Sequence, residues 1–155
     1  MTKGIVFTVT VMIYLSISLL MVIVTGCFKS KIDDKEAQKI LNDFYTDNVP
    51  EPILDRHLVN AGKAIVPYLL IEVQKKDMPR RGYAILALGK IGDKQALSVL
   101  IRILEDSSEL LYFRDDALRA IWHIDRKLGE EYARKYQGES KEIDRTIELL
   151  REGKI

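Results

Sequence analysis

Apolar residues recur at helical spacing along most of the chain after residue 34. The first such set shares one face of a helix predicted over about residues 35–46 and consists of Ala37, Ile40, Leu41 and Phe44. Prolines at positions 50 and 52 then break the helical pattern, because each disfavours helix at the residue before it. A second helix is predicted over residues 54–61, with Gly62 as its stop. No segment shows the sustained alternation of strands joined by hairpin turns, so the pattern predicts an all-α fold.

Two helices of this pattern occur twice. The segment Arg81–Ile91 is similar to Arg114–Ile124, with arginine at the start of both and alanine at two matching inner positions of each. The segment Val66–Val73 aligns in the same way with Leu97–Leu104. The two kinds of helix alternate along the chain, so the sequence predicts a series of helical hairpins.

The matching alanines, 84 and 87 in one copy and 117 and 120 in the other, have a physical reason. Small side chains let two helices approach towards about 8 Å, the short end of the usual range. Gly92 and Asp93 predict the turn between the helices of a hairpin, with Asp93 as a helix cap. Further along, a helix is expected to begin at Gly129 and end near Gly138, and Ser140 is expected to cap a last helix over residues 141–152.

The stretch Arg80–Leu104 resembles the short bacterial HEAT repeat found in phycobilisome lyase subunits and many other proteins, and the resemblance extends over roughly residues 52–136. It implies a short α-solenoid of stacked helical hairpins with capping helices, and most often protein binding. The unit around residues 54–73 lacks the small-residue stripe and is expected to be an atypical cap. Lyase chemistry is not implied, because the repeat is a scaffold.

The N-terminus shows a different pattern. Lys3 precedes the uncharged, mostly apolar run Ile5–Val24, which ends in Val24-Thr25-Gly26-Cys27. This end resembles a bacterial lipoprotein signal, which implies cleavage between Gly26 and Cys27 and lipidation of the Cys27 thiol. The competing interpretation is an uncleaved membrane anchor, because the run is longer than the roughly 7–15 residues of a usual signal core.

The chain therefore divides into three expected parts. Residues 1–26 are the lipoprotein signal peptide or anchor, residues 27–34 a short tether, and residues 35–155 the HEAT-like repeat domain. Under both interpretations of the N-terminus, the repeat domain is exported and held at the cell membrane.

Charge and composition exclude several classes of function. The chain has 24 Lys and Arg against 23 Asp and Glu, whereas a nucleic-acid binder normally shows a clear basic excess. A single cysteine excludes an internal disulfide and a cysteine-based zinc cluster. His57 and His123 each lie two residues from an aspartate, a spacing at which helical side chains diverge. No metal or cofactor is expected.

Catalytic patterns are missing as well. The sequence has no Ser-His-Asp pattern, P-loop or glycine-rich dinucleotide turn. The acidic pairs at residues 33–34, 115–116 and 130–131 are expected near helix starts, where they favour the helix dipole. We therefore expect a non-catalytic interaction module that binds another, unidentified protein of the bacterial cell envelope. The alternative is a small envelope enzyme or accessory enzyme subunit anchored by an uncleaved helix.

The expected binding surface lies on the second helix of each hairpin, which lines the concave side of HEAT-like stacks. Its outward positions form one stripe across two units: Ile71, Gln74, Ser98, Arg102 and Glu105. Ile71 is the apolar exception, and it is expected either to touch a partner or to pack under the N-terminal helix.

Three further features have two interpretations each. Arg81 and Arg114 either form a basic ladder for an acidic partner or bond to a neighbouring turn, with Asp77 or Asp106 as partners. Trp122 is either a buried wedge against the C-terminal helices or an exposed anchor. The insertion at residues 107–113 is either an apolar patch at the rim or a loop folded into the core.

Overall fold

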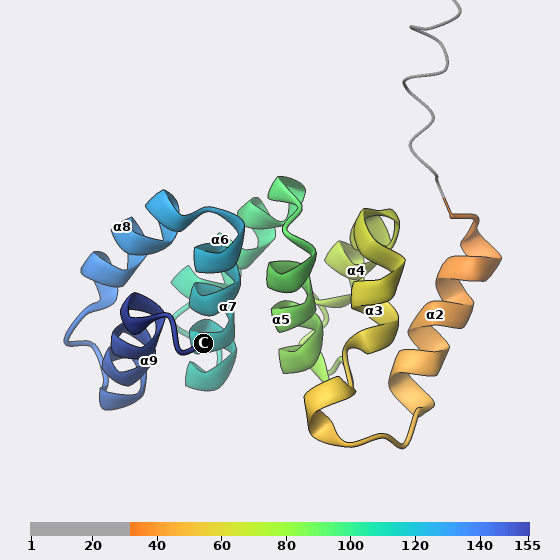
Figure 1. The fold of residues 1–155 in the computed structure, drawn as a ribbon, viewed down its shortest axis with the longest axis horizontal. Coiled ribbons are helices and arrows are strands. Elements are labelled where there is room, and N and C mark those ends of the chain that lie inside the picture. Colours follow the sequence, from red (N-terminus) through yellow and green to blue (C-terminus); the bar gives the residue numbers. More distant parts are fainter. Residues whose placement is uncertain (1–31) are drawn as a thin grey trace, which may run out of the picture. The chain divides into compact units, whose positions relative to one another are not determined.

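Helices account for all regular secondary structure in residues 32–155, the part of the chain that the computed structural model describes. The α-helices of this part are α2 (Asp34–Thr46), α3 (Arg56–Ala61), α4 (Val66–Glu72), α5 (Arg81–Ile91), α6 (Leu97–Glu105), α7 (Leu111–Ile124), α8 (Arg126–Tyr136) and α9 (Lys141–Glu152) (Figure 1). The predicted all-α fold is confirmed for these residues. The expected signal or anchor, its cleavage point and Cys27 lie outside them.

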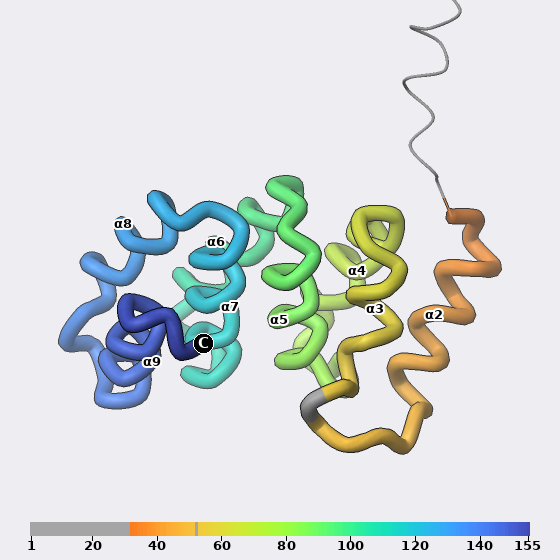
Figure 2. Tube along the Cα trace, in the orientation of Figure 1, coloured from red at the N-terminus to blue at the C-terminus, as the bar shows by residue number. Residues whose placement is uncertain are grey.

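The helices are stacked in two layers. Helices α3, α5 and α7 lie side by side, and α4 and α6 lie behind them (Figure 1). Helix α2 packs on α3 at one end of the row, while α8 and α9 pack on α7 at the other end, as the chain trace also shows (Figure 2). One continuous hydrophobic core runs from Ala37 and Phe44 in α2 to Leu150 in α9.

Side-chain caps set the starts of three of the described α-helices, α2, α8 and α9. The Asp33 carboxylate accepts a hydrogen bond from the Glu36 amide at 2.8 Å, so α2 begins at Asp34, one residue before the expected start. The Ser140 hydroxyl accepts from the Ile143 amide at 3.1 Å and caps α9 as predicted. The predicted start of the preceding helix is wrong. Helix α8 begins at Arg126, because the Asp125 carboxylate accepts from the Leu128 amide at 3.1 Å.

Small residues form the contact between α5 and α7. Ala84 and Ala87 of α5 and Ala117 and Ala120 of α7 are fully buried, as the repeated alanines predicted. A Cβ added at Gly89 would lie 2.7 Å from the Cα of Ala120, well inside van der Waals contact. The two helices therefore approach as closely as the glycine allows.

Trp122 occupies the position in α7 that Gly89 occupies in α5, and it is buried at 3% exposure. The backbone of α8 lies against it, since a Cβ added at Gly129 would stand 2.5 Å from the Cα of Trp122. The Arg126 guanidinium stacks over the indole, 4.2 Å from the ring centroid. The prediction of a buried wedge is confirmed.

Helix α2 is part of the stack. The Tyr68 hydroxyl of α4 donates a hydrogen bond to Asp34 at 2.8 Å, and the Tyr45 hydroxyl donates to Glu72 at 3.1 Å. Arg80 has a left-handed backbone (φ 56°), which is unusual for a residue with a side chain. Its guanidinium donates to the carbonyls of Phe44 and Asp47. These bonds hold the end of α2 against the turn before α5.

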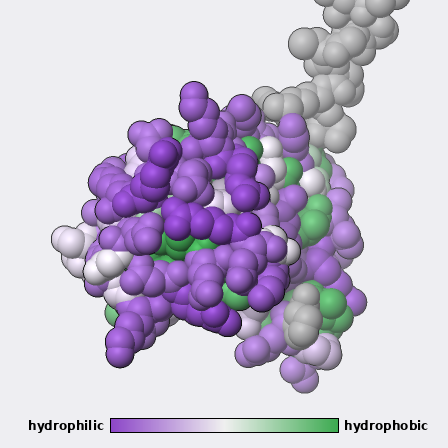
Figure 3. Space-filling model, turned by 60° about the vertical axis from the view of Figure 1, so that its left-hand side comes forward, coloured by the Kyte–Doolittle hydropathy of each residue, from purple (hydrophilic) through white to green (hydrophobic). Residues whose placement is uncertain are grey.

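The C-terminal end of the stack is covered by a polar surface. The outward side of α9 carries mostly charged residues, among them Lys141, Glu142, Arg145 and Glu148. A view towards the α8–α9 end shows a largely hydrophilic surface with a small apolar area (Figure 3). Such a surface is typical of a capping element in a repeat protein. Within residues 32–155, no helix combines the length and apolarity needed to cross a bilayer.

Candidate protein-binding site

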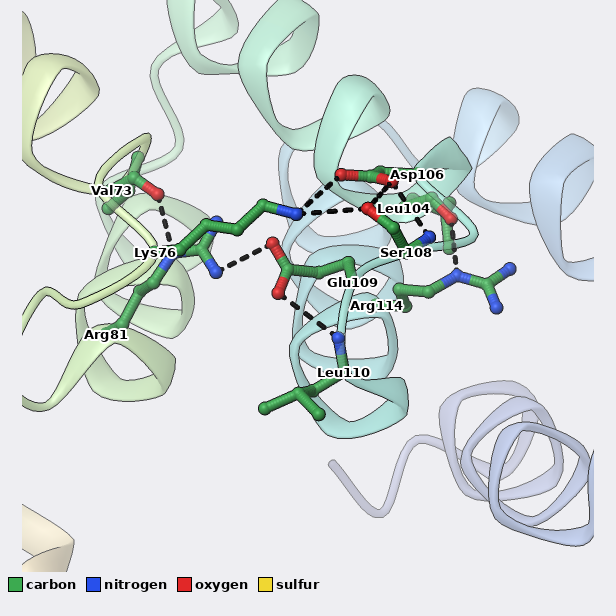
Figure 4. A network of polar contacts seen from close by, with 9 residues as sticks. All are labelled: Val73, Lys76, Arg81, Leu104, Asp106, Ser108, Glu109, Leu110 and Arg114. Atoms are coloured by element: carbon green, nitrogen blue, oxygen red, sulfur yellow. Dashed lines mark hydrogen bonds and ion pairs between the residues drawn. The ribbon is translucent and has the colours of Figure 1, made fainter.

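Arg81 is buried at the junction of two hairpins. Its Nε donates a hydrogen bond to the carbonyl oxygen of Val73 at 2.7 Å, and its Nη1 donates to Glu109 at 2.7 Å (Figure 4). The guanidinium also stacks on Phe113, 4.7 Å from the ring centroid. The side chains of Arg81 and Glu109 are only 2% and 5% exposed, so this ion pair is part of the interior.

Arg114 repeats this arrangement one unit later. Its Nε donates to the carbonyl of Leu104 at 2.8 Å, its Nη1 donates to Glu139 at 2.6 Å, and it stacks on Tyr136. A bond from each arginine to a turn was one of the two expectations, and it is confirmed. Asp77 and Asp106 were the wrong partners, because the carboxylates come from the loops that follow α6 and α8.

The expected binding stripe does cross from α4 to α6. All five of its residues are exposed, and Ile71, at 61% exposure, does not pack under the N-terminal helix. The Gln74 amide nitrogen donates to the carbonyl of Leu70 at 2.5 Å, which turns its oxygen towards α6. Nη2 of Arg102 donates to that oxygen at 2.9 Å. The structure thus brings the two units together at Gln74 and Arg102.

At its far end, the stripe continues onto α8. Glu105 accepts a hydrogen bond from the Lys135 ammonium at 2.7 Å, and this contact lowers the pKa of the carboxyl. The Tyr132 hydroxyl also lies 3.4 Å from Glu105, and the Tyr132 and Tyr136 rings stack at 6.3 Å. Sequence reasoning missed Lys135 and Tyr132. The spacing of the two tyrosines, which places them on one helix face, was the available signal.

A small hollow of about 160 Å³ lies beside Arg102, between α6 and the turn after α4. Its lining includes three cations (Lys76, Arg81 and Arg102) and two carboxylates (Asp106 and Glu109). Lys76 donates to Asp106 at 3.2 Å, and Arg81 is paired with Glu109 (Figure 4). Hydrogen bonds from Ser108, together with Lys76, lower the pKa of Asp106 to about 2. Lys76 and Arg81 therefore already pair with the two carboxylates that line the hollow.

The insertion at residues 107–113 divides between the two expectations. Phe113 is 8% exposed and folds into the core. Leu110 and Tyr112 remain 56% exposed and line an open groove of about 640 Å³ between α5 and α7. Tyr112 and Phe113 differ in burial because both belong to α7, which begins at Leu111, and successive side chains of a helix point to different sides.

Two of the acidic pairs do not lie where the dipole argument placed them. Asp115 and Asp116 belong to the second turn of α7, and burial raises the pKa of Asp116 to about 7. Burial likewise raises the pKa of Asp115. Glu130 lies in the second turn of α8 and pairs with Arg151 at 2.9 Å. Neither pair lies in a first helical turn, so the helix dipole does not account for them.

The histidines lie apart from each other. Nε2 of His57 is 2.7 Å from the Asp47 carboxylate, and this hydrogen bond lowers the pKa of Asp47. The neighbouring Asp55 pairs with Lys90 at 2.6 Å. Burial lowers the pKa of His123. Over residues 32–155, no three His, Cys, Asp or Glu side chains gather as a metal site would require.

Comparison with known proteins agrees with this geometry. Searches of the curated proteins and of the solved structures found no match to the chain. Residues 80–106, which comprise α5, α6 and their flanking turns, match the family model described as the PBS lyase HEAT-like repeat. The described part of the chain is thus an all-helical stack built around a repeat similar to that of the PBS lyase HEAT-like family.

Proposed function

We propose that this protein is a non-catalytic interaction module, tethered to the bacterial cell membrane, that binds another envelope protein through its α4–α6 face. The observation that carries the binding part is the exposed stripe, in which Ile71 lies open to solvent and Arg102 meets Gln74 across two hairpins. Stacked repeats make such a surface continuous, which suits an extended protein interface.

The tether is proposed from the sequence. Cys27 follows a positively charged start and a long apolar run, and the three residues before it suit lipoprotein processing. A lipid on this thiol would hold the folded stack close to the membrane, because few residues separate Cys27 from the start of α2 at Asp34. A fully extended chain spans at most about 3.6 Å per residue.

Lipidation is tested by feeding cells an alkyne-bearing fatty acid and measuring its incorporation into the full chain. The expected result is labelling of the native protein and none of the Cys27→Ser variant. Equal labelling of both would reject a lipid on Cys27. The alternative, an uncleaved anchor, would give an unlabelled protein that stays in the membrane fraction at its full mass.

Binding is tested by chemical cross-linking in intact cells followed by purification of the full chain. Ile71→Asp should lower the yield of the main cross-linked partner at least about tenfold, because it places a charge in an apolar contact. Gln38→Asp, an exposed change on α2 outside the stripe, is the matched control. An unchanged yield for Ile71→Asp would place the binding surface elsewhere.

A further inference from the structure

The hollow beside Arg102 contains an imbalance of charge. Of its three cations, Lys76 and Arg81 already contact the two carboxylates that line it. The Arg102 guanidinium donates to the neutral amide of Gln74, and no carboxylate within residues 32–155 forms an ion pair with it. A guanidinium has five N–H donors in a planar fork and binds a carboxylate with two parallel hydrogen bonds. The hollow is therefore complementary to one additional negative group.

The direction of Arg102 is set before any partner arrives. The Gln74 amide is held by the carbonyl of Leu70, so its oxygen is the atom available to Arg102. This contact orients the guanidinium at the edge of the hollow and lowers the cost of ordering a long side chain on binding. Ile71 does not line the hollow, but it lies in the last turn of α4, three residues before Gln74, and presents an exposed apolar side chain there.

We propose that the partner docks on this face with an Asp or Glu side chain, which enters the hollow and pairs with Arg102, and with an adjacent apolar residue that covers Ile71. This inference rests on the proposed function and adds the chemistry of the partner. The site offers one cation, Arg102, together with the exposed apolar side chain of Ile71. An acidic residue beside an apolar residue on a protein surface matches both. The described unit as a whole carries 21 basic and 23 acidic residues, since Lys3, Lys29 and Lys31 precede it, and so lacks the basic excess that a polyanion would require.

The test places the photoreactive residue p-benzoylphenylalanine at position 98 of the full chain in the cells that produce it. Ser98 is exposed and lies one turn before Arg102, so the probe points to the surface beside the hollow. The cross-linked peptide is then sequenced by mass spectrometry. We expect a peptide in which an Asp or Glu lies within four residues of a large apolar residue.

Arg102→Gln in the probe-bearing chain should reduce cross-linking about tenfold or more, as expected for the loss of a charged hydrogen bond. Arg102→Lys keeps the charge but loses the planar fork, so it should give an intermediate yield. Arg134→Gln, an exposed cation of α8 outside the hollow, is the matched control and should leave the yield unchanged. Circular dichroism of each full chain in detergent verifies folding.

The outcomes separate this inference from the proposed function. A cross-linked peptide without an acidic residue, or a yield insensitive to Arg102→Gln, would overturn the carboxylate site while leaving an interaction module in place. No protein cross-link from probes at positions 71, 98 and 105 would reject both proposals. Cross-linking to lipid or nucleic acid in place of protein would also reject both.

Discussion

Arg81 and Arg114 hold equivalent positions in consecutive repeat units, but water reaches their ion pairs to different degrees. Glu109, the partner of Arg81, is 5% exposed in its side chain, whereas Glu139, the partner of Arg114, is 35% exposed. We call each arginine with its carboxylate partner a joint. The first joint, Arg81 with Glu109, lies between neighbouring hairpins inside the stack. The second joint lies at the C-terminal cap, where the chain leaves its loop in contact with solvent.

The two joints also use glycine in different helices. In the first, Gly89 of α5 admits the backbone of α7 at Ala120. In the second, α7 carries the large Trp122 at the equivalent position, and Gly129 of α8 provides the space. A close contact between neighbouring helices therefore needs a glycine in only one of them. Inside the stack the glycine is in the earlier helix, and at the C-terminal end it is in the later one.

The largest expected difference between the joints concerns the arginines. Arg81→Met leaves the buried Glu109 carboxylate without its counter-charge and with only the hydrogen bond from the Leu110 amide at 3.1 Å. The change should lower the free energy of unfolding by about 3–5 kcal/mol. Arg114→Met should cost about 1–2 kcal/mol, because water can solvate Glu139. Urea unfolding of the full chain in detergent measures both. Equal losses would show that the exposure of the carboxylate does not govern these ion pairs.

The next effect is a dependence of stability on pH that arises from Asp116 of α7, which faces Gly82 of α5 near the first joint. Burial raises the pKa of Asp116 from 3.8 to about 7, so the native state binds this proton more tightly than the unfolded chain does. Its contribution to stability is therefore complete below about pH 4 and lost as the pH rises to about 7. Between pH 5 and pH 8 the free energy of unfolding of the unsubstituted protein should fall by about 2 kcal/mol more than that of the Asp116→Asn variant. Parallel curves for the two proteins would contradict a raised pKa of Asp116.

A smaller effect is expected at the glycines. Gly89→Ala and Gly129→Ala both place a Cβ against backbone atoms and should each cost about 1–2 kcal/mol, since the clash exceeds the gain in helix propensity. Gly82→Ala is the control. Its Cβ would meet the flexible end of Asp116 at 2.7 Å and the Phe113 ring at an ordinary contact distance of 3.8 Å, so the stability of this variant should change by less than about 1 kcal/mol. Thermal melting compares the three variants, and a larger loss at Gly82 would reverse this ranking.

The smallest effect is expected outside both joints. Ile71→Ser and Tyr112→Ser remove exposed side chains and should change stability by no more than about 0.5 kcal/mol. The same urea measurement applies. A loss above 1 kcal/mol at Ile71 would mean that this residue supports the fold, and its proposed role in binding would lose its basis.

Several features of the stack could be predicted because they depend on residues close together in the chain. Ser140 caps α9 through an amide three positions away, and the alanines at 84 and 87 mark an inner face by their spacing alone. The start of α8 was missed because Gly129 was taken as a boundary. Asp125 offers the better cap, and the glycine is required inside the helix by contact with Trp122.

The candidate site was predicted only in part. The stripe on α6 follows from helical spacing, and Ile71 and Gln74 follow from the repeat alignment. The contact of Arg102 with Gln74, the bonds of Glu105 to α8 and the unmatched charge in the hollow do not follow. They depend on how far one hairpin is rotated against the next, which side-chain packing decides.

The sequence by itself determined the all-α fold, the small-residue inner face of α5 and α7, the repeat and the cap of α9 at Ser140. Each of these depends on local hydrogen bonding or on periodic burial of apolar side chains. The tertiary structure alone decided the partners of Arg81 and Arg114, the exposure of Ile71 and the partial burial of Asp116. These properties join residues that are distant in the chain. Their energies depend on how completely neighbouring hairpins exclude water, which no local pattern records.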